Sequence, residues 1–259
     1  MRPNTPHYVL TMDAAICHGG HFYAMSTMRD TIFGIFHMFA LSKTITNTEH
    51  TRDSHLLLRR LTVYLHHVLV KGQFDPKSPA LPAPHVPDVS TFEGALDLFL
   101  VCVVAELGEL LDPASYKKRH RDDLELEHDR LSIIHVRGLA RELRAWWSSQ
   151  FMFVYEDDPA VDGEAIFLQV FRHQVKALIS YKRDAEKANM EAEEPACHAT
   201  AFEVWTLRYF PRLWGEAIPK GASLDNFEWK GTGYTVIPAR VNKLFEPGSS
   251  KSDVFYLSQ

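Results

Sequence analysis

Apolar residues that recur three and four positions apart constrain this chain most, because such spacing places them on one face of an α-helix. Five or six segments carry this pattern, and convincing strand-type alternation is confined to the two ends of the chain. The sequence therefore predicts a mainly α fold with a small N-terminal β remnant and a loop-rich C-terminus. The expected helices cover residues 26–41, 54–71, 90–111, 122–153, 166–182 and 200–214.

Several of these helices carry further expectations. The capping-box spacing of Ser90 and Glu93 predicts a helix start at Ser90, and this helix is apolar enough to be central. Trp146 and Trp147 are expected to be core residues. The mostly charged segment 182–194 is expected to project into solvent, and Asp157 to Pro159 to form a plain turn. Near the C-terminus, residues 234–237 are expected to form a short strand.

The first 23 residues combine turn residues, strand-type alternation and metal-capable side chains. Pro3 and Pro6 favour an extended entry into a β-prone run with His7 at its start. A second short run ends at Gly19 and Gly20, where the backbone can bend, and His21 follows. This pattern predicts two short strands that carry three histidines.

The pattern Pro-x-x-Pro-His-x-Val-x-Thr, followed by Gly-Gly-His-Phe, resembles the closing part of a JmjC domain and is similar to such proteins of mushroom-forming fungi. The resemblance implies a double-stranded β-helix, a cupin-like fold, that binds Fe(II) and 2-oxoglutarate. It places the last iron ligand at His7 and pocket-lining positions at Thr11 and His21. At the position of His21 the family usually has asparagine. For an intact relative it implies hydroxylation or demethylation by a dioxygenase mechanism.

Two of the three iron ligands of that family come from an earlier His-x-Asp/Glu motif, which would lie before Met1. The chain's His-x-Asp at His120 to Asp122 follows His7 instead, in a run of charges that we interpret as a solvated helix face. We therefore expect a truncated product or gene model that does not bind Fe(II) and 2-oxoglutarate. Whether any enzymatic activity remains is left open.

Composition narrows the function classes further. The chain has 259 residues, 46% of them hydrophobic, and a formal net charge of −5, which gives no general attraction for nucleic acid. Three widely spaced cysteines, Cys17, Cys102 and Cys197, argue against a disulfide framework or a zinc finger. No signal peptide or membrane-spanning run is found, so we expect an intracellular protein of the nucleus or cytoplasm.

Five prolines between residues 73 and 89 predict an extended connector, either a surface crossing or a ligand for a proline-recognition module. The expected organisation has five parts. Residues 1–24 are the remaining JmjC strands, 25–72 a helical pair packed on them, 73–89 the connector, 90–214 a helical domain and 215–259 a loop-rich tail.

Histidines outside the N-terminal stretch are expected to have structural roles. His37 is interpreted as a core histidine, and His66 and His67 as surface or interhelix hydrogen-bonding residues. Two functions stay open: a JmjC-type oxygenase fragment, or a non-catalytic helical module. Protein partners through the helical domain are the class to consider, with no membrane and no strong nucleic-acid indication.

Overall fold

The computed structural model describes residues 10, 12–13, 24–41, 52–72, 85–111, 124–188, 198–210 and 233–239. These residues are mainly helical, as the periodicity predicts. The N-terminal β remnant stays a prediction, since most of residues 1–24 lie outside the described residues. The helices are α1 (Met28–Leu41), α2 (Arg52–Leu69), α3 (Phe92–Leu107), α4 (Leu124–Gln150), α5 (Gly163–Lys187) and α6 (Ala199–Tyr209), with short 3-10 turns at Met25–Thr27 and Gly108–Leu111.

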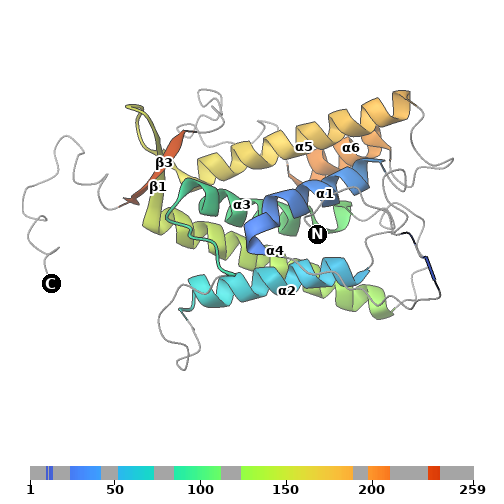
Figure 1. The fold of residues 1–259 in the computed structure, drawn as a ribbon, viewed down its shortest axis with the longest axis horizontal. Helices are drawn as coiled ribbons and strands as arrows, with labels where there is room; N and C mark the ends of the chain where they lie inside the picture. Colours follow the sequence, from blue (N-terminus) through green and yellow to red (C-terminus); the bar gives the residue numbers. More distant parts are fainter. Residues whose placement is uncertain are drawn as a thin grey trace, which may run out of the picture.

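Helix α3 lies at the centre of the bundle, as its sequence predicts. Figure 1 shows α5 with α6 on one side of it and α4 with α2 on the other, while α1 lies beside it. Apolar residues such as Leu98, Phe99 and Val103 occur all around α3 and are buried. A helix that is apolar on every side is stable only when other elements surround it.

The residue that caps the N-terminus of α3 differs from the prediction by one position. Thr91, not Ser90, caps the helix, and its hydroxyl oxygen accepts a hydrogen bond from the backbone N–H of Gly94 at 3.2 Å. Ser90 instead donates to the carboxylate of Asp88 at 2.6 Å, within the turn before the helix. The helix ends at Leu107, and the φ of 45° at the following Gly108 favours glycine because a side chain would be strained there.

A small antiparallel sheet of order β2-β1-β3 lies at one end of the bundle (Figure 1). Its strands are β1 (Phe151–Tyr155), β2 (Val161–Asp162) and β3 (Tyr234–Pro238). The strand predicted at 234–237 is therefore confirmed, and the turn at 156–158 links β1 and β2.

The prediction of a helix continuing to residue 153 is wrong, because α4 ends at Gln150 and β1 follows directly. The segment is rich in aromatic and β-branched residues, which favour strands. Backbone pairing with β3, with Tyr155 opposite Tyr234, satisfies its polar groups in extended form. The Phe153 ring then stacks on Trp147 with 4.6 Å between ring centroids.

One hydrophobic core joins helices from both sides of the proline-rich connector. Phe39 of α1 meets Phe202 of α6 with 5.0 Å between ring centroids, and Leu65 of α2 belongs to the same buried cluster. Trp147 is fully buried, as predicted, and its indole N–H donates to the carbonyl of Val89 at 2.9 Å. Trp146 is only partly buried against this core. Among the helices described, none is long and apolar enough to cross a membrane.

The expectation that residues from Lys182 onward project into solvent is wrong at Lys182. This side chain is almost fully buried, and its ammonium nitrogen donates to the carbonyl oxygens of Phe39 and Ala40, each at 3.4 Å. The last carbonyls of α1 lack partners within the helix, so a buried donor is stabilised there. Helix α6 ends at Tyr209, and its expected continuation to 214 lies outside the described residues.

Candidate functional site

The metal ligand and pocket positions expected from the sequence, His7, Thr11 and His21, lie outside the described residues. The same holds for the charged run that contains His120. Their roles remain predictions.

Within the described residues, no group of three or more His, Cys, Asp or Glu side chains could hold a metal ion. The donor set present there does not fit an Fe(II) site, which needs two histidines and a carboxylate with open positions. We assign no reaction step to iron or 2-oxoglutarate in this part of the chain.

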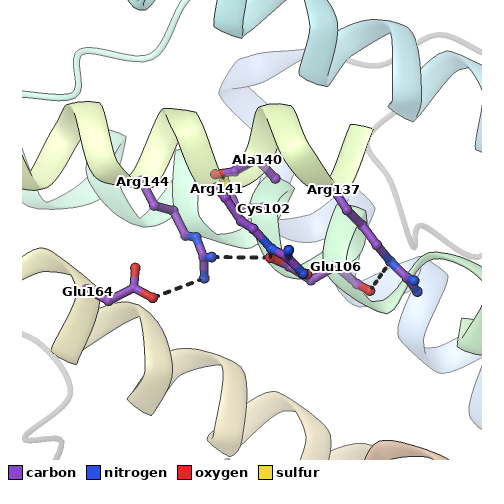
Figure 2. A network of polar contacts seen from close by, with 7 residues as sticks. All are labelled: Cys102, Glu106, Arg137, Ala140, Arg141, Arg144 and Glu164. Carbon is purple, nitrogen blue, oxygen red and sulfur yellow. Dashed lines mark hydrogen bonds and ion pairs between the residues drawn. The ribbon is translucent and has the colours of Figure 1, made fainter. Parts of the chain in front are cut away.

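The main polar cluster of the described structure is built around Glu106, near the end of α3 (Figure 2). Its carboxylate is almost fully buried and accepts two hydrogen bonds from Arg141 of α4, at 3.1 and 3.4 Å. Arg144, one helical turn further along α4, donates to the same carboxylate at 3.2 Å. A single buried negative charge thus receives two guanidinium groups from one helix.

Three further contacts extend this cluster to α5 and to the end of α3. The guanidinium of Arg144 lies 3.6 Å from the carboxylate of Glu164 and sits 3.9 Å from the centroid of the Phe167 ring. Arg137 donates to the backbone carbonyl oxygen of Glu106 at 2.9 Å. The cluster therefore ties three helices together where α3 ends (Figure 2).

Burial decides which contact of the cluster matters most. The side chain of Arg141 is 63% exposed, whereas that of Arg144 is 9% exposed. An exposed ion pair contributes about 0–1 kcal/mol, because water competes for both charges. A buried charge that loses its partner costs several times more. Arg144 is therefore the partner on which the burial of Glu106 depends.

Cys102 lies one turn before Glu106 in α3, and its thiol donates to the carbonyl of Ala140 at 3.6 Å. Burial raises the pKa of this thiol to about 12, with Glu106 adding to the rise and Arg144 opposing it. At neutral pH the group stays a thiol, which is a poor nucleophile. The cluster consequently has the chemistry of an interhelix staple and not that of a nucleophilic site.

Sequence reasoning did not find this cluster, although the sequence contains a sign of it. Arg137, Arg141 and Arg144 are four and three residues apart, so they share one face of α4. Glu106 is a single acid that directly follows the longest apolar run, residues 98–105. A lone buried acid requires cations nearby, but the sequence does not say which helix provides them.

Three histidines that were predicted to have structural roles lie within the described residues. His66 of α2 is buried, and its Nε2 lies 2.7 Å from a carboxylate oxygen of Glu142 on α4, so it makes the interhelix contact expected. His67 is exposed. His37 is only partly buried and stacks on Phe33, with 4.8 Å between ring centroids.

Large apolar side chains remain exposed on the outer faces of several helices. Contiguous exposed apolar surface is typical of sites that bind other proteins. Among the described helices, exposed large apolar residues occur in α1, α2, α4, α5 and α6, and they are Phe33, Leu57, Val63, Tyr64, Leu131, Ile134, Tyr181, Val204, Leu207 and Tyr209.

Comparisons with protein-family models, with curated proteins and with solved structures give no match.

Proposed function

We propose that this chain is a JmjC-type protein whose helical bundle is a non-catalytic scaffold and protein-interaction module. The observation that carries the interaction module is that the charged side chains inside the bundle are paired with one another. Glu106, Arg141 and Arg144 contact one another, and Cys102 is a buried thiol. The chemistry-bearing side chains of this cluster hold helices together, while exposed apolar residues remain on the outer helix faces.

The family part of the proposal rests on the N-terminal motif alone. His7 followed by Gly20-His21-Phe22 supports it, because these residues match the positions of a JmjC iron ligand and its pocket. In intact relatives, bound Fe(II) supplies the oxidative decarboxylation of 2-oxoglutarate. One imidazole does not replace a three-ligand site, so we expect this chain to lack that activity as it stands.

A second candidate function, residual oxygenase activity, is favoured by the same motif. The two candidates differ in what the purified chain does with Fe(II), 2-oxoglutarate and dioxygen. The module predicts a stable helical fold with no more succinate formed than in a blank. The oxygenase predicts succinate formation that depends on His7.

The deciding experiment measures succinate production and far-UV circular dichroism on the wild-type chain, His7→Ala and His135→Ala. His135 is an exposed histidine of α4 and controls for the loss of an imidazole. We expect no succinate from any of the three proteins and the same helical spectrum for all. Turnover in the wild type and His135→Ala that disappears in His7→Ala would establish the oxygenase instead.

A further inference from the structure

The outward surface of α2 combines exposed apolar side chains with exposed basic side chains. Leu57, Val63 and Tyr64 are 37%, 40% and 36% exposed. Arg60 and His67 of the same helix are exposed, and so is Lys71 in the turn that follows. We call these six residues the α2 outer face.

Helical spacing brings the members of this face together. Leu57, Arg60, Tyr64, His67 and Lys71 follow one another at intervals of three, four, three and four residues, so they form one stripe along the helix. Val63 lies at the edge of that stripe. The opposite face, with Leu58, Thr62 and Leu65, is buried against the bundle. The stripe is therefore an outer surface with a defined geometry.

The charged side chains of the α2 outer face are all basic. From residue 55 to residue 72 the sequence contains no Asp or Glu, although the whole chain has a formal net charge of −5. His85, just before α3, adds an exposed imidazole, and its ring centroid lies 5.4 Å from that of Tyr64. The nearby Glu142 of α4 is already paired with His66. A local basic surface on an acidic chain attracts a small acidic partner more than it attracts a long polyanion.

We propose that the α2 outer face docks an acidic amphipathic segment of a partner protein. Apolar side chains of the segment would cover Leu57, Val63 and Tyr64, and its carboxylates would pair with Arg60, His67 and Lys71. Arg60 and His67 are two turns apart, or about 10 Å along the helix, so the matching carboxylates are expected at similar separation. This inference rests on the interaction module proposed above and assigns it a surface and a class of partner.

Nucleic acids and anionic membranes are the competing classes of ligand. A phosphate backbone would use the basic residues but leave the apolar ones uncovered, and the overall negative charge would oppose it. An anionic membrane would require a broader apolar face than three side chains provide. The combination of narrow apolar contact with flanking cations fits a peptide better.

The test measures fluorescence anisotropy of a labelled helical peptide in which leucines recur three and four apart and glutamates flank them. Its matched control has lysine at every glutamate position. A labelled single-stranded oligonucleotide and vesicles containing phosphatidylserine represent the competing classes. Arg60→Glu/Lys71→Glu reverses two charges of the face, and Lys176→Glu/Arg208→Glu reverses two exposed charges on α5 and α6. Circular dichroism confirms that each variant is folded.

We expect the wild type to bind the glutamate peptide at roughly micromolar Kd and the lysine peptide not at all. Arg60→Glu/Lys71→Glu should weaken binding about tenfold or more, Tyr64→Ala should weaken it several-fold, and Lys176→Glu/Arg208→Glu should change it less than about twofold. No binding of the glutamate peptide would overturn the inference. Equal loss in both double variants would overturn it as well, as would tighter α2-dependent binding of the oligonucleotide or the vesicles.

These outcomes are distinguishable from a failure of the proposed function. Succinate formation that depends on His7 would refute the non-catalytic proposal whatever the peptide does. Peptide binding that survives Arg60→Glu/Lys71→Glu would refute the α2 surface but leave an interaction module in place.

Discussion

Lys182 of α5 donates from its buried ammonium group to the carbonyl oxygen of Phe39, near the end of α1, at 3.4 Å. The two residues are 143 positions apart in the sequence. The ammonium group also lies 5.2 Å from the centroid of the Phe39 ring. The sequence around Lys182 predicts a solvated tail. In the structure this side chain instead caps the C-terminal end of a helix that is distant in the sequence.

Replacing this lysine tests that contact. We expect Lys182→Met to lower the free energy of unfolding by about 1–3 kcal/mol, because buried carbonyl oxygens lose a donor while the apolar stem is kept. Lys176→Met, at an exposed position of the same helix, should change it by less than about 0.5 kcal/mol. Urea denaturation of both variants measures the difference. An equal loss of unfolding free energy in the two variants would contradict the capping role of Lys182.

The Glu106 cluster predicts unequal effects from its two arginines. Arg144→Met should destabilise the fold by roughly 3 kcal/mol, because Glu106 loses its buried partner. Arg141→Met should cost about 1 kcal/mol or less, since that side chain is mostly exposed.

A double-mutant cycle with Glu106→Gln and Arg144→Met, followed by chemical denaturation, measures the coupling between the two residues. We expect the double variant to be more stable than the sum of the single effects predicts, because no unpaired buried charge remains. Additive effects would show that the pair does not interact energetically.

Asp97 of α3 predicts a pH dependence. Burial raises the pKa of its carboxyl group above the ordinary value, and the Arg29 guanidinium, 2.9 Å away, opposes the rise. The folded state therefore binds a proton at Asp97 more tightly than the unfolded chain does. The contribution of Asp97 to stability therefore falls as the pH rises through the pKa values that its carboxyl group has in the unfolded and the folded state.

We expect Asp97→Asn to gain stability relative to the wild type as pH increases from about 3 to about 7, because asparagine does not titrate. Arg29 is 49% exposed, so water can solvate it in the variant. Urea midpoints at both pH values measure the gain. Asp157→Asn, in the exposed turn after β1, controls for removal of one carboxylate. If Asp97→Asn instead lost stability relative to the wild type as the pH increased, the ion pair with Arg29 would outweigh the effect of burial.

Replacement by alanine is expected to change the stability of the fold in opposite directions at two glycines. A Cβ at Gly94 would lie 2.0 Å from the carbonyl oxygen of Asp88, so Gly94→Ala should destabilise by roughly 1–3 kcal/mol. A Cβ at Gly138 of α4 would meet nothing within 4 Å, so Gly138→Ala should stabilise by about 0.5–1 kcal/mol. Thermal unfolding compares them. Stabilisation by both substitutions would show that the turn before α3 can move aside.

The local sequence pattern predicts those secondary-structure elements whose conformation depends mainly on residues close to one another in the sequence. The apolar content of residues 98–107 indicates a buried central helix, and Trp147 is buried as its large apolar area predicts. Trp146 is equally large but only partly buried, so size does not separate the two. The strand at 234–237 was likewise predictable from its composition. The candidate JmjC positions His7, Thr11 and His21 are sequence predictions that the described residues leave untested.

The tertiary structure decided what depends on contacts between distant segments. Residues 151–153 continue a helical pattern, but pairing with β3 makes them extended. Lys182 belongs to a charged run, but it is buried because its ammonium group donates to the carbonyl oxygens of Phe39 and Ala40 at the end of α1. Glu106 and Arg144 become partners only when α3 and α4 pack. Periodicity is a local property, so the sequence indicates the helical segments, with residues 151–153 as the exception. It did not determine which charges are buried, because a polar group is stable inside a protein only where another part of the chain supplies its partner.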